Sequence, residues 1–179
     1  MPGPVFCSSE RVELRTTERE DIDLLQQARS DPELRTSLMF ILPQTREQVE
    51  EFYENTVSVS NGDSNFIVCV DGEPIGEASL FDIERDHGTI AYWLDADYRG
   101  NGYATEAVSL LLDYAFDTRG LHRVVAKIGD FNDGSQALIE RLGFTQEGRL
   151  RDHLFSQGKY RDVFFYGLLR DEWTSNSDD

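Results

Sequence analysis

The sequence predicts a single domain of the mixed α/β class, in which strands and helices share one hydrophobic core. Three observations predict this class. Apolar strand-like runs follow one another in mid-chain, two amphipathic helical segments enclose a further strand, and two strand-like segments close the chain. This order differs from the regular alternation that builds a parallel sheet. A chain of 179 residues suits one such domain, expected at 1–173 with a disordered tail at 174–179.

The first predicted elements are a strand and two helices. Alternating side chains at 11–16 (RVELRT) predict the strand. The segments 17–20 (TERE) and 45–48 (TREQ) each match a capping box, in which a threonine is followed three residues later by an acid or an amide. Apolar residues recur at helical spacing after each box, so we expect a helix to begin at both places.

Three strand-like runs follow in mid-chain. They lie at 65–70 (NFIVCV), 75–83 (IGEASLFDI) and 89–94 (TIAYWL). The turn sequences DGEP and RDHG separate them, so the runs are expected to form an antiparallel meander.

The second half predicts helix, strand, helix and two strands. Apolar residues from Val108 to Phe116 define one amphipathic helix, which Gly120 closes, and Gly143 closes a second helix that begins near Asn132. The run 122–128 (HRVVAKI) is the strand between them. The two final strands surround the turn SQGK.

Charge is the unusual feature of the composition. Aspartate and glutamate number 34 against 17 basic residues, so the formal net charge is −17. Such a chain repels phosphates overall, which argues against non-specific nucleic-acid binding. Two explanations remain open, and they are compatible: a carboxylate coat for solubility in strong salt, as in halophilic proteins, or attraction of a cationic amine.

The remaining composition suggests a cytoplasmic protein. Cys7 and Cys69 are too few for a disulfide framework or a metal cluster, so no metal is expected. No apolar run is long enough to span a membrane, and the first fifteen residues do not resemble a signal peptide.

The segment 97–108 (DYRGNGYATEAV) places two glycines directly before a predicted helix. Gly100 and Gly102 permit unusual backbone shapes and let a ligand approach closely. Free N–H groups and the positive end of the helix dipole would then bind phosphate, and Arg99 could add a charge-assisted bond. The alternative is a simple tight turn with a glycine-rich cap.

Two motifs in order resemble one known family. The spacing Arg99-x-x-Gly102-x-Ala104 resembles the pyrophosphate loop of the GCN5-related N-acetyltransferases, the GNAT superfamily. Asn132-x-x-Ser135, with LGF closing the helix, resembles that family's second acetyl-CoA segment. The segments IGEASL, AYWLDADYRGNGYATEA and GKYRDVFFYGLL are most similar to the RimJ/RimL type, which acetylates the N-termini of ribosomal proteins.

The resemblance implies a GNAT-like fold and acetyl-CoA as co-substrate, without a metal. Its central sheet would be mostly antiparallel, flanked by about four helices, and splayed where the pantetheine arm lies along the strand that ends near Asp95. Backbone near Trp93 or Leu94 would stabilise the oxyanion. The cofactor-binding residues implied are Trp93, Leu94, Asp95, Arg99, Gly100, Asn101, Gly102, Tyr103, Ala104, Thr105, Asn132 and Ser135.

The catalytic assignments are less direct. Glu77 is our candidate base, because it follows a glycine on a central strand; an outward-facing acid is the alternative. Many relatives carry a tyrosine, suited to protonate the departing thiolate of CoA, where this chain has Ile139. Ser135 is the nearest hydroxyl left for that role. Capping alone is the alternative for Ser135. For Asn132 the alternative to a cofactor contact is the helix N-cap, and the two roles are compatible. Further possible bases or donors are His153, Tyr92, Tyr103, Tyr160 and Tyr166.

Other functions remain open at this level. The chain could be an acyl-CoA sensor without turnover, or a nicotinamide oxidoreductase that uses the two glycines, with Asp130 as ribose acid. The expected acceptor is a peptide N-terminus, including that of a ribosomal protein, with polyamines, amino acids and aminoglycosides as alternatives. The segment 31–65 is expected to shape the acceptor groove, and a homodimer is possible.

Overall fold

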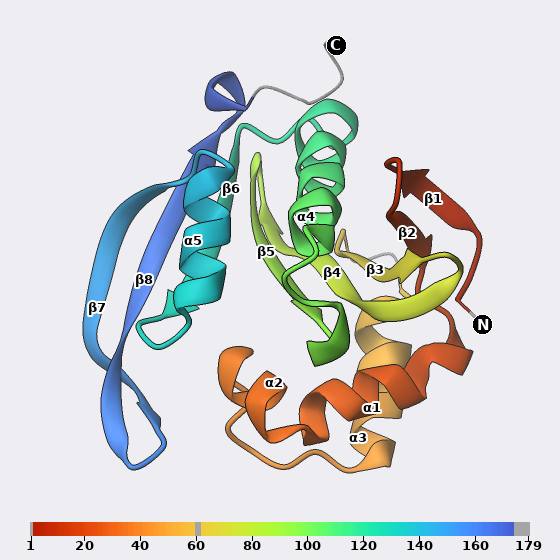
Figure 1. Cartoon of the computed structure of the whole chain (residues 1–179), viewed down its shortest axis with the longest axis horizontal. Coiled ribbons are helices and arrows are strands. Elements are labelled where there is room, and N and C mark those ends of the chain that lie inside the picture. The colour runs from red at the N-terminus through yellow and green to blue at the C-terminus, as the bar shows by residue number, and fades with distance from the viewer. Residues whose placement is uncertain (1, 60–61, 174–179) are drawn as a thin grey trace.

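A computed structural model of the chain describes residues 2–59 and 62–173 (Figure 1). Eight strands form one sheet in the order β1-β2-β3-β4-β5-β6-β8-β7. The predicted mixed α/β class is confirmed, and residues 174–179, expected to be disordered, lie outside the described residues.

The elements have the following bounds. The strands are β1 Val5–Ser8, β2 Glu13–Thr16, β3 Ser64–Val70, β4 Glu73–Glu84, β5 His87–Leu94, β6 Arg123–Gly129, β7 Thr145–Ser156 and β8 Lys159–Leu169. The α-helices are α1 Ile22–Ser30, α2 Pro32–Ser37, α3 Arg46–Phe52, α4 Tyr103–Asp113 and α5 Asp133–Arg141. Helices α3 and α4 each continue into a π-helical turn, Tyr53–Val57 and Tyr114–Thr118.

The sheet is mostly antiparallel, and its single parallel pairing is short. Among the described strands only β5 and β6 run parallel, and they pair over His87–Thr89 and Arg123–Val125. Beyond these residues no pairing joins the two strands within the described chain, while β5 stays paired with β4 as far as Leu94. The sheet is therefore splayed between β5 and β6, as predicted.

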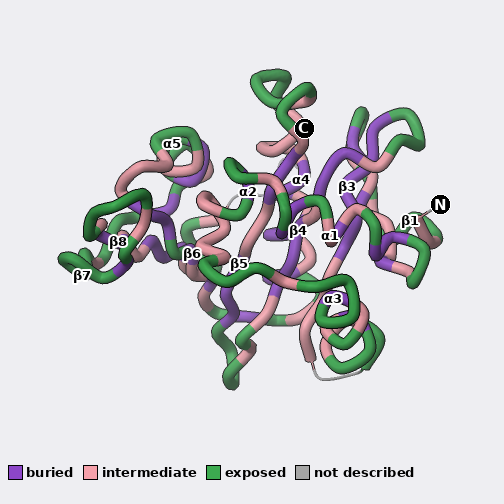
Figure 2. The backbone as a smooth tube through the Cα atoms, turned by 90° about the horizontal axis from the view of Figure 1, so that it is seen from below, coloured by how far each residue is buried: buried purple, intermediate pink, exposed green. Residues whose placement is uncertain are grey.

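Helices cover both faces of this sheet (Figure 1). Helix α4 packs on β2, β4 and β5, and α5 packs on β6; their apolar sides share the largest buried cluster with the strands. Helices α1–α3 form two smaller buried clusters, one of which includes Trp93. In Figure 2 buried residues concentrate along the central strands, while β7 and the outer turns of α3 are largely exposed.

Strand alternation sends neighbouring β5 side chains to different helical layers. Leu94 belongs to the cluster beneath α4, whereas Trp93 packs against Ala28 of α1 and Leu34 of α2. A site built around the end of β5 therefore has access to both layers.

Two elements were missed, and one cap was placed wrongly. The missed elements are β1 and α2. Helix α2 follows Asp31, whose carboxylate accepts hydrogen bonds from the Glu33 and Leu34 amides at 2.9 and 2.8 Å. The box predicted at 17–20 is wrong, since the Thr17 hydroxyl donates to the Asn65 carbonyl and the Glu18 amide donates to Asp21. The box at 45–48 is confirmed.

Candidate active site

The splay leaves one edge of β5 open over its last residues. From Ile90 onward β5 has a neighbour on the β4 side alone within the described chain. An extended amide chain can add to such an edge by main-chain hydrogen bonds. This edge leads directly into a short 3-10 turn, Ala96–Tyr98, and then into the glycine loop.

Six successive backbone N–H groups at the head of α4 lack acceptors in the part of the chain that the structure describes. Gly100 and Gly102 have φ of 77° and 87°, left-handed values that favour glycine, and α4 begins at Tyr103. Within the described chain, none of the amides from Gly100 to Thr105 donates a hydrogen bond. A helix start with free amides and a positive dipole end is suited to an anion.

Arg99 directs its side chain away from these amides. Its Nε donates to the Leu94 carbonyl at 3.0 Å, and its guanidinium pairs with Glu33 of the α2 region. Its amide donates to the Ala96 carbonyl at 3.2 Å. For Arg99 to form the expected charge-assisted bond to a phosphate, its side chain would have to leave the Leu94 carbonyl and Glu33.

Asp95 directly follows β5. Its carboxylate accepts a hydrogen bond from Gln27 Nε2 at 3.1 Å. Burial raises its pKa, and the Arg99 charge opposes that rise. The Asp95 amide donates to the Ile75 carbonyl at 2.8 Å, which ties the end of β5 to β4.

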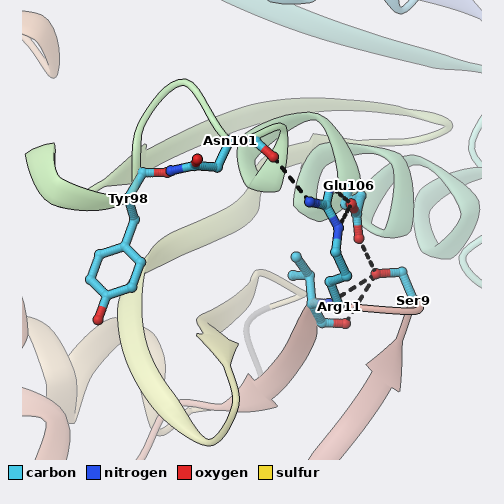
Figure 3. Close-up of polar contacts among 6 residues, drawn as sticks. Ser9, Arg11, Tyr98, Asn101 and Glu106 are labelled. Atoms are coloured by element: carbon cyan, nitrogen blue, oxygen red, sulfur yellow. Dashed lines mark hydrogen bonds and ion pairs between the residues drawn. The ribbon is translucent and has the colours of Figure 1, made fainter.

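Arg11, from the turn between β1 and β2, contacts the glycine loop directly (Figure 3). Its Nη1 donates to the Asn101 carbonyl at 3.2 Å, and its guanidinium lies 5.0 Å from the Tyr103 ring centroid. Glu106, in the first turn of α4, forms an ion pair with Arg11 and accepts a hydrogen bond from Ser9 Oγ at 2.7 Å. Sequence reasoning missed Arg11, because no local pattern links residues ninety positions apart.

Glu77 lies on β4 directly opposite Trp93. Its carboxylate accepts hydrogen bonds from Trp93 Nε1 and Ser79 Oγ, both at 3.1 Å. The preceding Gly76 is required sterically, because a Cβ there would lie 2.1 Å from the Trp93 carbonyl oxygen. The Glu77 side chain is thus a fixed, half-buried carboxylate on the face of β4 and β5 that α1 and α2 cover.

Buried Arg29 of α1 interacts electrostatically with Glu77. Arg29 is only 7% exposed and lies between the rings of Phe40 and Phe52, at 5.1 and 4.6 Å from their centroids. Burial lowers the pKa of this guanidinium, and the charge of Glu77 opposes the shift.

Asn132 and Ser135 stand at the start of α5. The Asn132 Oδ1 accepts a hydrogen bond from the Ser135 amide at 3.1 Å, so its predicted N-cap role is confirmed. Ile139, at the position of the family's usual tyrosine, is fully buried. The cofactor contacts expected of Asn132 and Ser135 stay predictions.

Comparison with known proteins identifies the family. Residues 11–145 match the family described as "Acetyltransferase (GNAT) domain". "Uncharacterized N-acetyltransferase p20" of Bacillus licheniformis is 35% identical over 172 residues, covering 92% of this chain and 96% of that protein. The chain belongs to the GNAT acetyltransferase family.

One sequence relative and one solved structure show how this GNAT protein resembles enzymes of stated substrate. A spermidine N(1)-acetyltransferase of Escherichia coli K12 is 30% identical over 167 residues, covering 87% of this chain and 84% of that protein. The solved structure of RimL, the ribosomal L7/L12 alpha-N-protein acetyltransferase in complex with coenzyme A, superposes with a TM-score of 0.81 at 23% identity, covering 93% and 98% of the two chains.

Membership of the GNAT family makes the chain an acetyl-CoA-dependent N-acetyltransferase with the predicted fold. The nicotinamide oxidoreductase alternative is thereby excluded. The predicted RimJ/RimL subtype stays a prediction, because the likeness to RimL, at 23% identity, shows the fold alone.

Tyr92 is one of the possible proton donors that the sequence offered, and the structure buries its hydroxyl near the start of α5. Tyr92 lies on the open part of β5, and its Oη is buried without a hydrogen-bond partner in the described chain. Burial raises its pKa to about 12, and the neighbouring Ser135 side chain opposes that rise without meeting hydrogen-bond geometry. A buried donor is therefore available beside the start of α5.

The other candidates are placed less favourably. His153 is exposed on β7, and Tyr160 is exposed on β8, where its ring contacts Phe155. Tyr166 donates its hydroxyl to Glu140, and Tyr103 lies under Arg11. Within 2–59 and 62–173 no group of three metal-ligating side chains gathers, and none of the helices there is long and apolar enough to cross a membrane.

The Tyr92 hydroxyl yields a stability prediction. A buried hydroxyl without a partner costs free energy, so Tyr92→Phe should raise the free energy of unfolding by about 1 kcal/mol in urea denaturation at neutral pH. Tyr166→Phe is the matched control, since it removes a bond to Glu140 and should lower that free energy by about the same amount. Destabilisation by both variants would contradict the assignment.

Tyr92→Phe also gives a test at alkaline pH. The pKa of Tyr92 is about 12 in the folded state and ~10 in an unfolded chain. Between pH ~10 and about 12 the phenol therefore ionises in the unfolded chain but not in the folded protein, and the free energy of unfolding falls over this range. The unfolding free energy of Tyr92→Phe should therefore fall less over this range than that of the parent.

Proposed function

We propose that the protein transfers the acetyl group of acetyl-CoA directly to the α-amino group of a protein or peptide N-terminus, in a ternary complex. One observation carries this proposal: six N–H groups from Gly100 to Thr105, which have no acceptor among residues 2–59 and 62–173, stand at the head of α4, beside the open edge of β5. Such amides hold phosphate oxygens, so the diphosphate of the co-substrate would lie there and its pantetheine arm along β5.

The chemistry of this arrangement divides between the two helical layers. Asn132 and Ser135 begin α5 on the layer that α4 also covers, whereas Glu77 lies in the layer of α1 and α2. The acetyl group would reach the amine through the splay, where a backbone N–H near Trp93 or Leu94 would stabilise the charge on the thioester oxygen. A primary amine would approach from the Glu77 side.

Glu77 is proposed to accept the proton of the attacking amine. Its two hydrogen bonds, from Trp93 and Ser79, orient the carboxylate and leave lone pairs free for the amine or an intervening water. Held in this way, the base loses little freedom when the substrate arrives.

Hydroxyl groups at the start of α5 would stabilise the departing thiolate. Ser135 stands within one turn of the Asn132 cap, and the unpartnered Tyr92 hydroxyl is buried beside it. A thiolate needs little help to leave, since thiol pKa values lie near ~8.5, so a hydrogen bond can replace full proton transfer. The usual tyrosine at position 139 would then not be needed.

The charge near Glu77 favours a singly charged acceptor. The buried guanidinium of Arg29 acts on the Glu77 carboxylate and would repel further positive charges near the reacting amine. A peptide α-amino group also titrates near ~8, against ~10.4 for a lysine-type amine, so more of it is neutral at pH 7.

A polyamine is the second candidate acceptor. The relative from E. coli is a spermidine acetyltransferase, and a protein with a net charge of −17 attracts polycations at long range. Long-range attraction would speed encounter, whereas the local charge near Glu77 would decide turnover.

The direct experiment measures free thiol release from acetyl-CoA with a panel of acceptors. We expect release with peptides that carry a free N-terminus and none with N-terminally blocked peptides of the same sequence. Faster release with spermidine than with every free peptide would favour the polyamine. Tight acetyl-CoA binding without thiol release from any amine would indicate a sensor and contradict the proposal.

Gly102→Val tests the diphosphate site. A side chain at this left-handed position strains the loop backbone, and its Cβ would lie 3.1 Å from Arg11 Nη2. The amides should therefore be displaced, and affinity for CoA in calorimetry should fall by at least about tenfold, or ~1.4 kcal/mol. Gly158→Val in the β7–β8 turn is the matched control, because its φ of 81° imposes similar strain far from the loop. Unchanged affinity in Gly102→Val would rule out this site.

Glu77→Gln tests the base. The amide keeps the size of the side chain but cannot take a proton, so kcat should fall by about a hundredfold while CoA affinity is unchanged. Glu73→Gln, an exposed position on the same strand, makes the same charge change and should keep its rate. A parental rate for Glu77→Gln across pH would exclude Glu77.

A further inference from the structure

Arg11 occupies a position from which it controls the shape of the glycine loop. It lies on the turn between β1 and β2, and its Nη1 donates to the Asn101 carbonyl, which is located between the two left-handed glycines (Figure 3). Its guanidinium also stacks at 5.0 Å on the ring of Tyr103, the first residue of α4. One side chain thus contacts both residues that flank Gly102.

We propose that Arg11 is a positioning residue that holds the loop amides in their phosphate-binding arrangement. This inference rests on the proposed diphosphate site. The Asn101 carbonyl and the Gly102 N–H belong to one planar trans peptide unit and therefore point in opposite directions. A hydrogen bond from Arg11 to that carbonyl consequently turns the Gly102 N–H to the opposite side of the loop, where we place the phosphate.

The loop needs such a support because its own sequence provides little. Glycine adopts many backbone conformations, so a free loop with Gly100 and Gly102 would have to be ordered each time the ligand binds. Fixing a residue before binding removes that entropic cost from the binding step. Arg99, the other cation of the loop, is engaged with Leu94 and Glu33 and does not provide this support.

Arg11 is itself held in place from α4. Its Nε donates to Glu106 Oε1 at 2.7 Å, and the other carboxylate oxygen accepts from Ser9 Oγ at 2.7 Å. The Glu106 amide in turn donates to the Gly102 carbonyl at 3.2 Å. Glu106 also neutralises the guanidinium, which would otherwise lie unfavourably near the positive end of the helix dipole.

The test separates positioning from a direct charge effect. In Arg11→Ala we expect the Kd for CoA to rise about tenfold, or ~1.4 kcal/mol, with kcat at saturating acetyl-CoA within about twofold of the parent. The ratio of the two Kd values should stay constant from low to high salt, because the guanidinium acts through the loop shape. A ratio that shrinks towards one in high salt would overturn the proposal in favour of direct attraction.

The matched control is Arg15→Ala. Arg15 lies on β2, pairs with Glu13, and makes no contact with the loop, so its removal changes the net charge equally. Its Kd for CoA should equal that of the parent. Circular dichroism of every variant confirms that the compared proteins are folded.

A double-mutant cycle with Glu106→Gln completes the test. If Glu106 acts by holding Arg11, Glu106→Gln should add little to the loss already caused by Arg11→Ala. Additive losses of CoA affinity would show that Glu106 acts independently of Arg11 and would contradict the proposal that Glu106 holds Arg11 in place. Failure of the parent to bind CoA would reject the proposed function, whereas normal binding by folded Arg11→Ala would reject only this inference.

Discussion

The parting of β5 and β6 after three residue pairs is the constraint on which the rest of the structure depends. A parallel pair that continued would close the sheet and bury the last residues of β5 on both edges. Because it stops, β5 keeps one open edge from Ile90 to Leu94, while β4 holds the other. Helix α4 begins nine residues after Leu94, so the open edge and the free amides at its head are neighbours by chain connection. The co-substrate site proposed here follows from that adjacency.

Alternation along β5 then separates the two halves of the chemistry. Leu94 and its neighbours in the α4 layer border the proposed co-substrate, while Trp93 faces α1 and α2 and holds the carboxylate of Glu77. Gly76 allows this arrangement, because no larger residue would let the Trp93 carbonyl approach β4 so closely. Acetyl donor and amine would thus meet at the splay from opposite faces of one sheet.

Backbone N–H groups, rather than side-chain charges, are the proposed source of attraction for the anionic co-substrate. A chain with a net charge of −17 is proposed to bind a polyanion, and both arginines near the loop are already paired with carboxylates, Arg99 with Glu33 and Arg11 with Glu106. Attraction therefore has to come from oriented N–H groups and the helix dipole, whose direction the acidic surface does not change. Arg11 serves as a support for those amides, whereas Arg99 is held by the Leu94 carbonyl and Glu33.

The sequence by itself determined the fold class, the strand meander, the glycine loop and the cap of α5, because each depends on residues close in the chain. Helix α2 could also have been found, since Asp31 and Pro32 form a local start signal. Only the tertiary structure decided which way Arg99 points, that Arg11 grips the loop, and that the Tyr92 hydroxyl is buried without a partner. These features depend on segments far apart in sequence, and no local pattern encodes which side chains meet when the sheet brings such segments together.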